Sequence, residues 1–366
     1  MQPTPPDTST SIHTTFNTQL NHIWSVNEWG RLREIIIGNP HFAHIPALTD
    51  LSQLSFDRPE PQDQPDPGTR PMPKWVIDET TEDIQQLQQL LQNLGVRVHH
   101  AAAVDCSFPV RSPDWTADQE HSINIRDITL IQGNLIIDAA SPTRGRCYER
   151  CAVADLFHSY LRRRPGRYTG PPRPRLTDAT YDLSRSRGIN ELEPLFDAAN
   201  CVRLGRDLII DINNTANQTG AVWLQQALDQ HYGPNSIRVH CTHLSPDHLD
   251  VIIVPLCEGV AMINPKYVQP HFLPGFLKNW KLIEAAEMVP QTFHSGTPKA
   301  SNWIGLNLLV VDGTEKTVIV EERQTPLIRL LEHHGFHPLP TRWRHGRTWG
   351  GGFHCVTLDV HREGEL

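Results

Sequence analysis

The sequence has no long apolar run and no excess of basic residues. No stretch reaches the ~18 consecutive apolar residues that a membrane-spanning helix needs. Lys and Arg together number 33 against 41 Asp and Glu, a formal net charge of −8, so the basic surface of a nucleic-acid-binding protein is missing. We therefore expect a soluble globular protein that binds neither membrane nor nucleic acid.

Paired cysteines are lacking as well. Seven cysteines are present, an odd number, and none of them shows the CxxC spacing that is typical of zinc sites. Cys147 and Cys151 would lie on one side of a helix, but two thiols fall short of the ligands of a structural zinc ion. Residues 1–19 have neither the basic start nor the apolar core of a signal peptide. These features predict a protein of the reducing cytoplasm with no metal ion and no disulfide framework.

The chain is expected to form one domain, residues 25–366, after a disordered tail at residues 1–24. Two Pro-rich stretches, 56–74 and 162–178, are too polar and too rich in helix breakers for a core and predict long surface loops. Loops of this length in a compact domain are often lids or binding elements.

A helix followed by a β-branched strand recurs along the chain. Each copy reads as an amphipathic helix that ends at a glycine. The copies cover residues 80–100, 219–240 and 325–340.

Pairs of apolar strands joined by tight turns lie between these copies. The pairs cover residues 127–138, 201–212, 250–264 and 305–321, and a single strand within 25–40 opens the series. Their turns contain Gly-Asn, Gly-Arg, Glu-Gly and Asp-Gly, which indicate hairpins. A repeated strand–strand–helix–strand unit predicts blades around a centre, whereas a doubly wound sheet would alternate single strands with helices. An open α+β domain with accidental repetition is the alternative.

Acidic residues, a histidine and a cysteine stand where these repeats begin or end. They are Asp127, Asp197, Asp247, His248, Asp250 and Cys355. In a radial fold the strand edges of different repeats converge on one axis, so these side chains would meet. Taken singly, each has a structural explanation, since acids often sit in turns or caps and free cysteines are often buried.

The stretch GGGFHC at residues 350–355 places three glycines before Cys355. Consecutive glycines weaken packing and usually mark a place where main chain must approach another group closely. A loose turn before the last strand, with Cys355 as a small buried apolar residue, is the simpler interpretation.

Together, the candidate residues suit attack on a guanidino group. A thiolate is a strong nucleophile toward a planar, electron-poor carbon, and paired carboxylates bind a guanidinium through two hydrogen bonds. A histidine can protonate a leaving amine and later accept a proton from an incoming one.

Six segments resemble the glycine/inosamine amidinotransferase family of the guanidino-group-modifying superfamily. They read VNEWGRLREIIIG, the IRD of INIRD, FDAAN with VRLGRD, DHLD, NWIGLN with VVD, and GGGFHC, in the family's order. The resemblance covers about residues 25–366. It implies an α/β fold, a five-bladed ββαβ propeller with pseudo-fivefold symmetry, transfer of an amidino group from L-arginine to a small amine, and a homodimer.

The same resemblance implies a role for each candidate. Cys355 would be the nucleophile that becomes an amidino-cysteine, and His248 the general acid and base. Asp197 would orient and charge this histidine, while Asp127 and Asp250 would hold the guanidinium. No metal ion or organic cofactor is expected, because a thiol and carboxylates suffice.

Departures from the family pattern cluster around the expected acceptor pocket. The changed positions are His121, Ser245, Asp247, Tyr267, Ala300 and Ser301. Tyr267 stands where glycine-using members have an Arg that clamps carboxylates, and Lys266 cannot replace its bidentate fork. The added charge of Asp247 would disfavour a free carboxylate. The pattern resembles saxitoxin-type amidinotransferases of cyanobacteria, although drift in surface loops would also explain it.

Three functions fit these residues. Amidino transfer from arginine to an amine, with release of ornithine, is the expected one. Hydrolysis of the same covalent intermediate by water is the second, and exclusion of water from the site would separate the two. A guanidino-binding module without catalysis is the third, and the complete set of Cys, His and Asp residues argues against it.

Overall fold

The computed structural model describes residues 22–366 except 48, 57–67, 164–165, 185–187 and 296–297. Most of the expected tail, residues 1–21, and much of the first Pro-rich stretch therefore lie outside the described residues. Ile23 is only 2% exposed, and the main-chain N–H of Trp24 donates to Val360 O at 2.9 Å. The packed chain thus begins before Ser25, where the sequence placed the start of the domain.

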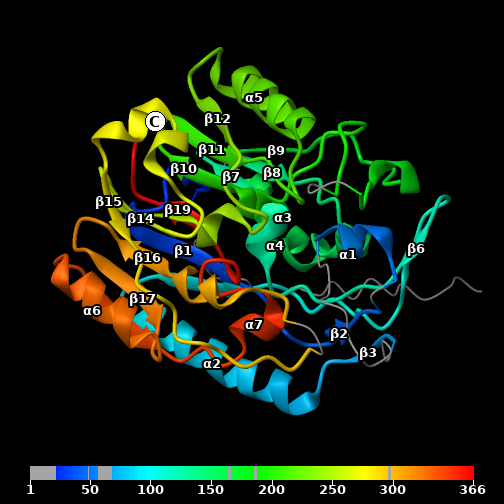
Figure 1. Ribbon diagram of the computed structural model, residues 1–366, viewed down its shortest axis with the longest axis horizontal. Helices are drawn as coiled ribbons and strands as arrows, with labels where there is room; N and C mark the ends of the chain where they lie inside the picture. The colour runs from blue at the N-terminus through cyan, green and yellow to red at the C-terminus, as the bar shows by residue number, and fades with distance from the viewer. Residues whose placement is uncertain (1–21, 48, 57–67, 164–165, 185–187, 296–297) are drawn as a thin grey trace, which may run out of the picture.

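Five three-stranded sheets with one common topology form the described protein (Figure 1). In each, the first two strands pair antiparallel, as a hairpin in all but the first sheet, and the third runs parallel to the second. In chain order the sheets are β19 (Thr357–Arg362), β1 (Leu32–Ile37) and β4 (Arg97–His100); β7 (Thr129–Gln132), β8 (Leu135–Asp138) and β9 (Arg167–Thr169); β10 (Cys201–Leu204), β11 (Asp207–Asp211) and β12 (Arg238–Thr242); β13 (Ile253–Cys257), β14 (Val260–Ile263) and β15 (Lys281–Glu284); β16 (Leu309–Asp312), β17 (Thr317–Glu321) and β18 (His337–Thr341). A mixed α/β fold built from ββαβ-like repeats is therefore confirmed, and accidental repetition is wrong.

A helix connects the second and third strands in four of these sheets. The helices are α2 (Lys74–Asn93), α4 (Cys151–Arg163), α5 (Gln218–Tyr232) and α6 (Thr325–His333). In α2 the buried residues Val76, Ile84, Leu87 and Leu91 recur at helical spacing, which packs one face on the sheets. In Figure 1, α2, α5 and α6 lie at the outside of the molecule.

Two connections differ from the sequence prediction. Helix α4 was not predicted, and β9 lies within residues 162–178, which were expected to be loop. Between β14 and β15 the 3₁₀ turns η5 (Pro270–Phe272) and η6 (Gly275–Asn279) replace an α-helix. Prolines at the starts of both turns explain this, because they lack the N–H that a continued helix needs.

The remaining elements are short and lie between the sheets. They are β2 (His44–Ile45), α1 (Leu51–Phe56), β3 (Arg70–Pro71), β5 (Val110–Arg111), β6 (Thr116–Ala117), α3 (Ile125–Ile128), η1 (Arg144–Tyr148), η2 (Asp178–Thr180), η3 (Ala198–Asn200), η4 (Leu249–Val251), η7 (Asn302–Leu306) and α7 (Gly346–Trp349). Among all described helices, none combines the length and the apolar character needed to cross a membrane.

The two ends of the chain pair with each other in the first sheet. Strand β1 pairs antiparallel with β19, with Ile36 opposite Leu358, and parallel with β4. Apolar residues of the fifth sheet, Leu309 and Ile319, share a buried cluster with Ile35 of the first. Strand β19 also contacts β7, β10 contacts β13, and buried clusters join the second sheet to the third and the fourth to the fifth, so the sheets follow one another in a closed ring.

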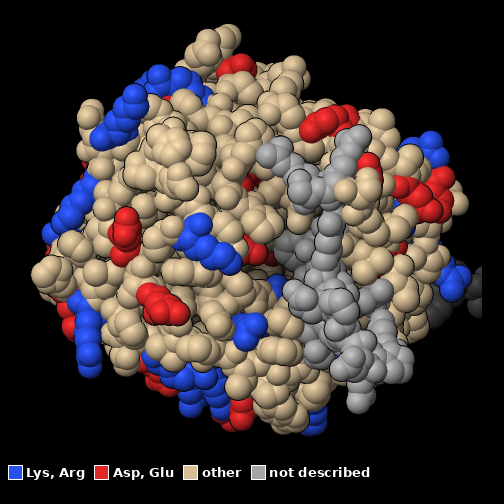
Figure 2. Space-filling view, viewed as in Figure 1, with Lys and Arg blue, Asp and Glu red and all other residues tan. Residues whose placement is uncertain are grey.

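Basic and acidic side chains are interspersed over the described part of the face shown in Figure 2. This agrees with the nearly balanced charge count of the sequence.

Candidate active site

A short helical turn comes directly before the first strand of every sheet. These turns are α3 before β7, η3 before β10, η4 before β13, η7 before β16, and residues 353–356 before β19. Turn η3 contacts both α3 and η4, η4 contacts η7, and α3 contacts β19. Equivalent positions of five repeats thus meet in one place. They carry Asp127 in α3, Asp197 at the start of η3, His248 and Asp250 at η4, Ser301 at the start of η7, and Cys355 in the last turn.

Cys355 is buried beside a carboxylate. Its Sγ donates to Asp250 Oδ2 at 3.3 Å, and its main-chain N–H donates to Asn307 Oδ1 at 2.9 Å. Burial raises the pKa of this thiol well above its ordinary value, and the charges of Asp250 and Asp127 raise it further. The thiol therefore holds its proton until a cation offsets these charges.

The glycines before Cys355 bring main chain against two asparagine side chains. A Cβ atom on Gly351 would lie 2.2 Å from Asn124 Oδ1, and one on Gly352 would lie 2.8 Å from Asn307 Cβ. The N–H of Gly352 also donates to Asn307 Oδ1 at 3.1 Å. These contacts fix the turn that carries the thiol, so the run is not a loose turn.

His248 lies between two of the buried acids. Its Nε2 is 3.1 Å from Asp197 Oδ2 and its Nδ1 is 3.8 Å from Asp127 Oδ1. Burial lowers the pKa of this imidazole, but the charge of Asp127 and the hydrogen bond with Asp197 outweigh burial and raise the pKa to about 9. At neutral pH the ring is consequently an acid with a proton to give.

Three carboxylate oxygens of the site receive no hydrogen bond from the described residues. They are the buried Oδ1 atoms of Asp127, Asp197 and Asp250, and of these acids Asp127 and Asp250 are the pair expected to hold a guanidinium. Burial raises the pKa of Asp127 despite the nearby cations, whereas the hydrogen bond from His354 outweighs burial and lowers the pKa of Asp250. A buried acceptor without a donor is costly, so this pair suits a ligand that brings N–H groups and positive charge, as a guanidinium does.

Arg146, which the sequence analysis did not single out, closes one side of this acidic cluster. It comes from η1, and its Nη1 is 3.1 Å from Asp127 Oδ2 and 3.5 Å from Asp197 Oδ2. Glu149 binds its other side through Nε and Nη2, each at 2.9 Å. Burial raises the pKa of Glu149 to about 8, although Arg146 opposes this. Within RGRCYER these residues have the pattern of a solvated charged loop, so local spacing contains no signal for their role.

Three of the expected acceptor residues form one group. The hydroxyl of Ser301 donates to Asp247 Oδ2 at 3.5 Å, and the main-chain N–H of Asp247 donates to Ser245 Oγ at 3.0 Å. Burial raises the pKa of Asp247, while His248 and Lys266 lower it. The ammonium of Lys266 lies 4.8 Å from the centre of the Tyr267 ring.

His121 does not join this group. It is buried, stacks edge-on against Trp349 at 5.6 Å, and lies 3.8 Å from Glu120 Oε1. Burial lowers its pKa to about 4, so the ring is neutral. Among the described residues no hydrogen bond or ion pair links it to Asp247, Ser301 or Tyr267.

Comparisons with known proteins agree with this architecture, although no family model matches the chain. An inosamine-phosphate amidinotransferase of Streptomyces glaucescens is 39% identical over 347 residues, 93% of this chain and 97% of the relative. The L-arginine:L-lysine amidinotransferase of Pseudomonas savastanoi pv. phaseolicola is 30% identical, over 95% and 96%. The structure of SxtG, an amidinotransferase of the saxitoxin biosynthetic pathway of Microseira wollei, superposes with a TM-score of 0.83 and 32% identity, over 94% of this chain and 98% of SxtG.

Fold and sequence thus define the protein as a transferase. More narrowly, the chain belongs to the amidinotransferase family.

Proposed function

We propose that the protein moves the amidino group of L-arginine to an amine through a covalent intermediate on Cys355, with release of ornithine. The observation that carries this proposal is the contact of Cys355 Sγ with Asp250, in the same buried site as Asp127 and the protonated His248. The arginine named in the Pseudomonas relative supports the donor.

In the first half-reaction the guanidinium of arginine pairs with Asp127 and Asp250 and offsets their charges. The thiol then releases its proton to solvent, and the thiolate attacks the guanidinium carbon, forming an S–C bond. The bond from this carbon to Nε breaks as His248 gives its proton to the leaving nitrogen, which departs as the amine of ornithine.

In the second half-reaction an acceptor amine replaces ornithine. The amine attacks the amidino carbon and loses a proton to the neutral His248, and the S–C bond breaks to return the thiolate. Donor and acceptor thus react in turn, which gives ping-pong kinetics. Hydrolysis by water would instead release the amidino group without any amine.

We propose an acceptor other than glycine, in a pathway to a guanidinium natural product of the saxitoxin type. Tyr267 provides no clamp for a carboxylate, and Asp247 adds an acid beside His248, so an amine with a distant positive group fits better. The saxitoxin-pathway structure supports this class of product.

A phosphorylated amine is the second candidate acceptor. The Streptomyces relative, at 39% identity, is named for inosamine phosphate. A cavity of about 70 Å³ beside the acidic cluster is lined by Arg146, Arg150 and Arg173, and guanidinium groups bind phosphate well.

The test is incubation of the pure protein with guanidino-labelled arginine and a panel of amines. The panel contains glycine, lysine, a carboxylate-free diamine and inosamine phosphate, and ornithine and label transfer are followed. Transfer to an amine supports the proposal, and label released as urea in the absence of an amine favours hydrolysis. Transfer to inosamine phosphate alone favours the second acceptor.

We further propose that the five sheets are the blades of a pseudo-fivefold propeller and that two chains form a homodimer. Both are properties that the family resemblance implies. Light scattering of the pure protein measures the mass that tests the dimer.

A further inference from the structure

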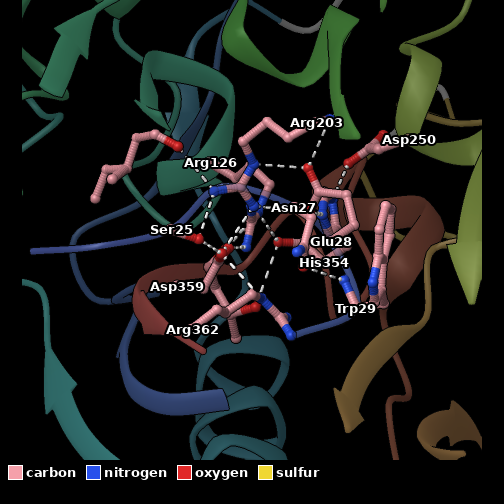
Figure 3. A network of polar contacts seen from close by, with 12 residues as sticks. Ser25, Asn27, Glu28, Trp29, Arg126, Arg203, Asp250, His354, Asp359 and Arg362 are labelled. Carbon is pink, nitrogen blue, oxygen red and sulfur yellow. Dashed lines mark hydrogen bonds and ion pairs between the residues drawn. The ribbon is translucent and has the colours of Figure 1, made fainter. Parts of the chain in front are cut away.

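The residue before the nucleophile, His354, lies between two carboxylates. Its Nδ1 is 2.8 Å from Asp250 Oδ2, and its Nε2 is 3.3 Å from Glu28 Oε2 (Figure 3). Only 11% of the side chain is exposed. The sequence analysis treated this histidine as part of the GGGFHC segment and gave it no role.

Both carboxylates are bound as anions. Arg203 holds Glu28 with two hydrogen bonds, Nε to Oε1 at 2.8 Å and Nη2 to Oε2 at 2.7 Å. Burial raises the pKa of Glu28, but Arg203 and His354 outweigh burial and hold it well below its ordinary value. Asp250 is likewise held as an anion, by His354, against the effect of burial.

Both ring nitrogens of His354 face carboxylate oxygens. An ionised carboxylate only accepts hydrogen bonds. In each of the two contacts the ring nitrogen is therefore the donor, Nδ1 toward Asp250 and Nε2 toward Glu28. The other charged groups behind it are Arg203 and Arg126, whose Nη1 lies 3.8 Å from Glu28 Oε2.

Asp250 therefore has two distinct oxygens. Its Oδ2 receives the ring N–H of His354 and the thiol of Cys355, while its Oδ1 receives no hydrogen bond from the described residues. The ring itself is anchored, through Glu28 and Arg203, to the ion pair of Arg203 in β10 with Asp359 in β19 (Figure 3).

We propose that His354 is a positioning residue for the amidino transfer, a ring held in place by Glu28 that in turn holds Asp250 so that Oδ1 faces the guanidinium of arginine. The inference rests on the proposed role of Asp250 in binding that guanidinium. It assigns the amidinotransferase a second functional histidine, one that does not touch the substrate and acts through its hydrogen bond to Asp250.

Two substitutions separate the two hydrogen bonds of the ring. The amide nitrogen of Asn lies near the position of Nδ1, so His354→Asn keeps a donor for Asp250 and loses the one for Glu28. The amide nitrogen of Gln lies near Nε2, so His354→Gln keeps the donor for Glu28 and loses the one for Asp250. Steady-state kinetics with arginine and a working acceptor, together with thermal melting, compares the two.

We expect H354Q to lower kcat/KM for arginine by about 10- to 100-fold, mainly through KM, since a charge-assisted hydrogen bond to a buried group is lost. The kcat/KM of H354N for arginine should stay within about fivefold of the wild type. Its melting temperature should fall more than that of H354Q, because Glu28 loses its contact with the ring. The matched control is His99→Asn, at a ring whose Nε2 lies 2.7 Å from buried Glu34 in the first sheet; its KM for arginine should not change.

Equal KM values for H354N and H354Q would overturn the inference, as would a loss of melting temperature with KM unchanged in both. If H354Q does not fold, H354N is compared with His354→Ala. A KM for arginine that is equally high in both variants would then overturn the inference, because the Asn amide would not replace the hydrogen bond to Asp250. Asp250→Asn separates this inference from the proposed function. An unchanged KM for arginine in D250N would contradict the proposed role of Asp250 in binding arginine. A raised KM in D250N together with an unchanged KM in H354Q would contradict only the role of His354.

Discussion

At the scale of single residues, the site gathers acids around a thiol that they keep protonated. Cys355, His248 and the aspartates were foreseeable as candidates, because the sequence shows acidic residues, a histidine and a cysteine at the starts of predicted strands. Arg146 and His354 were not, since their roles depend on partners far away along the chain. Glu28, for example, is 326 positions from His354.

Cys355→Ser is expected to abolish turnover, because the hydroxyl is a far weaker nucleophile than a thiolate. Wild-type protein given arginine without an acceptor should gain the mass of one amidino group on Cys355, measured by peptide mass spectrometry. Cys151→Ser, at an exposed cysteine, is the control and should keep full activity. An adduct on any other cysteine contradicts the assignment.

The proton of His248 predicts a pH dependence for ornithine release. Because the pKa is raised to about 9, the acidic form is present below pH 9 and is lost as the pH rises through that value. Single-turnover release of ornithine should therefore fall above about pH 9. His248→Asn should lower the rate at least ~100-fold and remove this decline, and Asp197→Asn should move it to lower pH. A decline that persists unchanged in H248N would show that another group titrates.

Arg146 is expected to hold the acidic cluster in place. Arg146→Met leaves Asp127, Asp197 and Glu149 buried without their shared cation, and removing one partner of a buried pair costs about 3–5 kcal/mol of unfolding free energy. Urea unfolding measures this cost. Arg150→Met, at a partly exposed ion pair with Asp138, is the control and should cost about 1 kcal/mol or less. Equal costs would contradict a special role for Arg146.

At the scale of elements, one short turn per sheet provides the site. Hairpin strands and helices α2, α5 and α6 were foreseeable, because glycine turns and apolar periodicity are local signals. Helix α4 was missed because the chain around it is rich in Arg and Pro, and the 3₁₀ turns before β15 have no period to detect. The contacts between the turns come from ring closure, which no local pattern encodes.

The segment before η4 and the turn after β14 predict acceptor choice. Asp247→Met combined with Tyr267→Arg removes the extra acid and restores a carboxylate clamp, so glycine should gain as an acceptor. An ionic contact of this kind is worth about 1–3 kcal/mol, or roughly 5- to 150-fold in kcat/KM. Relative kcat/KM for glycine and a carboxylate-free amine measures the shift. If the unmodified protein uses glycine as well as any other amine, the changed-acceptor argument fails and the family assignment stands.

At the scale of the whole molecule, a buried group of ions joins the sheets. Asp359 in β19 accepts hydrogen bonds from Arg126, Arg203 and Arg362, which come from α3, β10 and β19 (Figure 3). Buried residues far apart along the chain thus meet at the point where the ring closes, an arrangement that was not foreseeable from the sequence.

Asp359→Asn should lower the unfolding free energy by about 3–5 kcal/mol, because buried guanidinium groups lose their shared anion. Burial raises the pKa of Asp359, but the three arginines outweigh burial and hold the pKa well below its ordinary value. Its contribution is therefore present above the unfolded pKa of about 3.9 and is lost as the pH falls through the folded value. Urea unfolding between pH 7 and pH 3 should show less acid sensitivity in D359N; identical slopes would contradict this.

The pairing of β1 with β19 has a consequence for synthesis in the cell. Cys355 and its neighbour His354 are translated after Asp127, Asp197 and His248. A growing chain can form its middle sheets, but it has neither the Cys355 thiol nor the pairing of β1 with β19 until β19 has been made. Chains that stop before Cys355 are therefore expected to be inactive in the proposed amidino transfer.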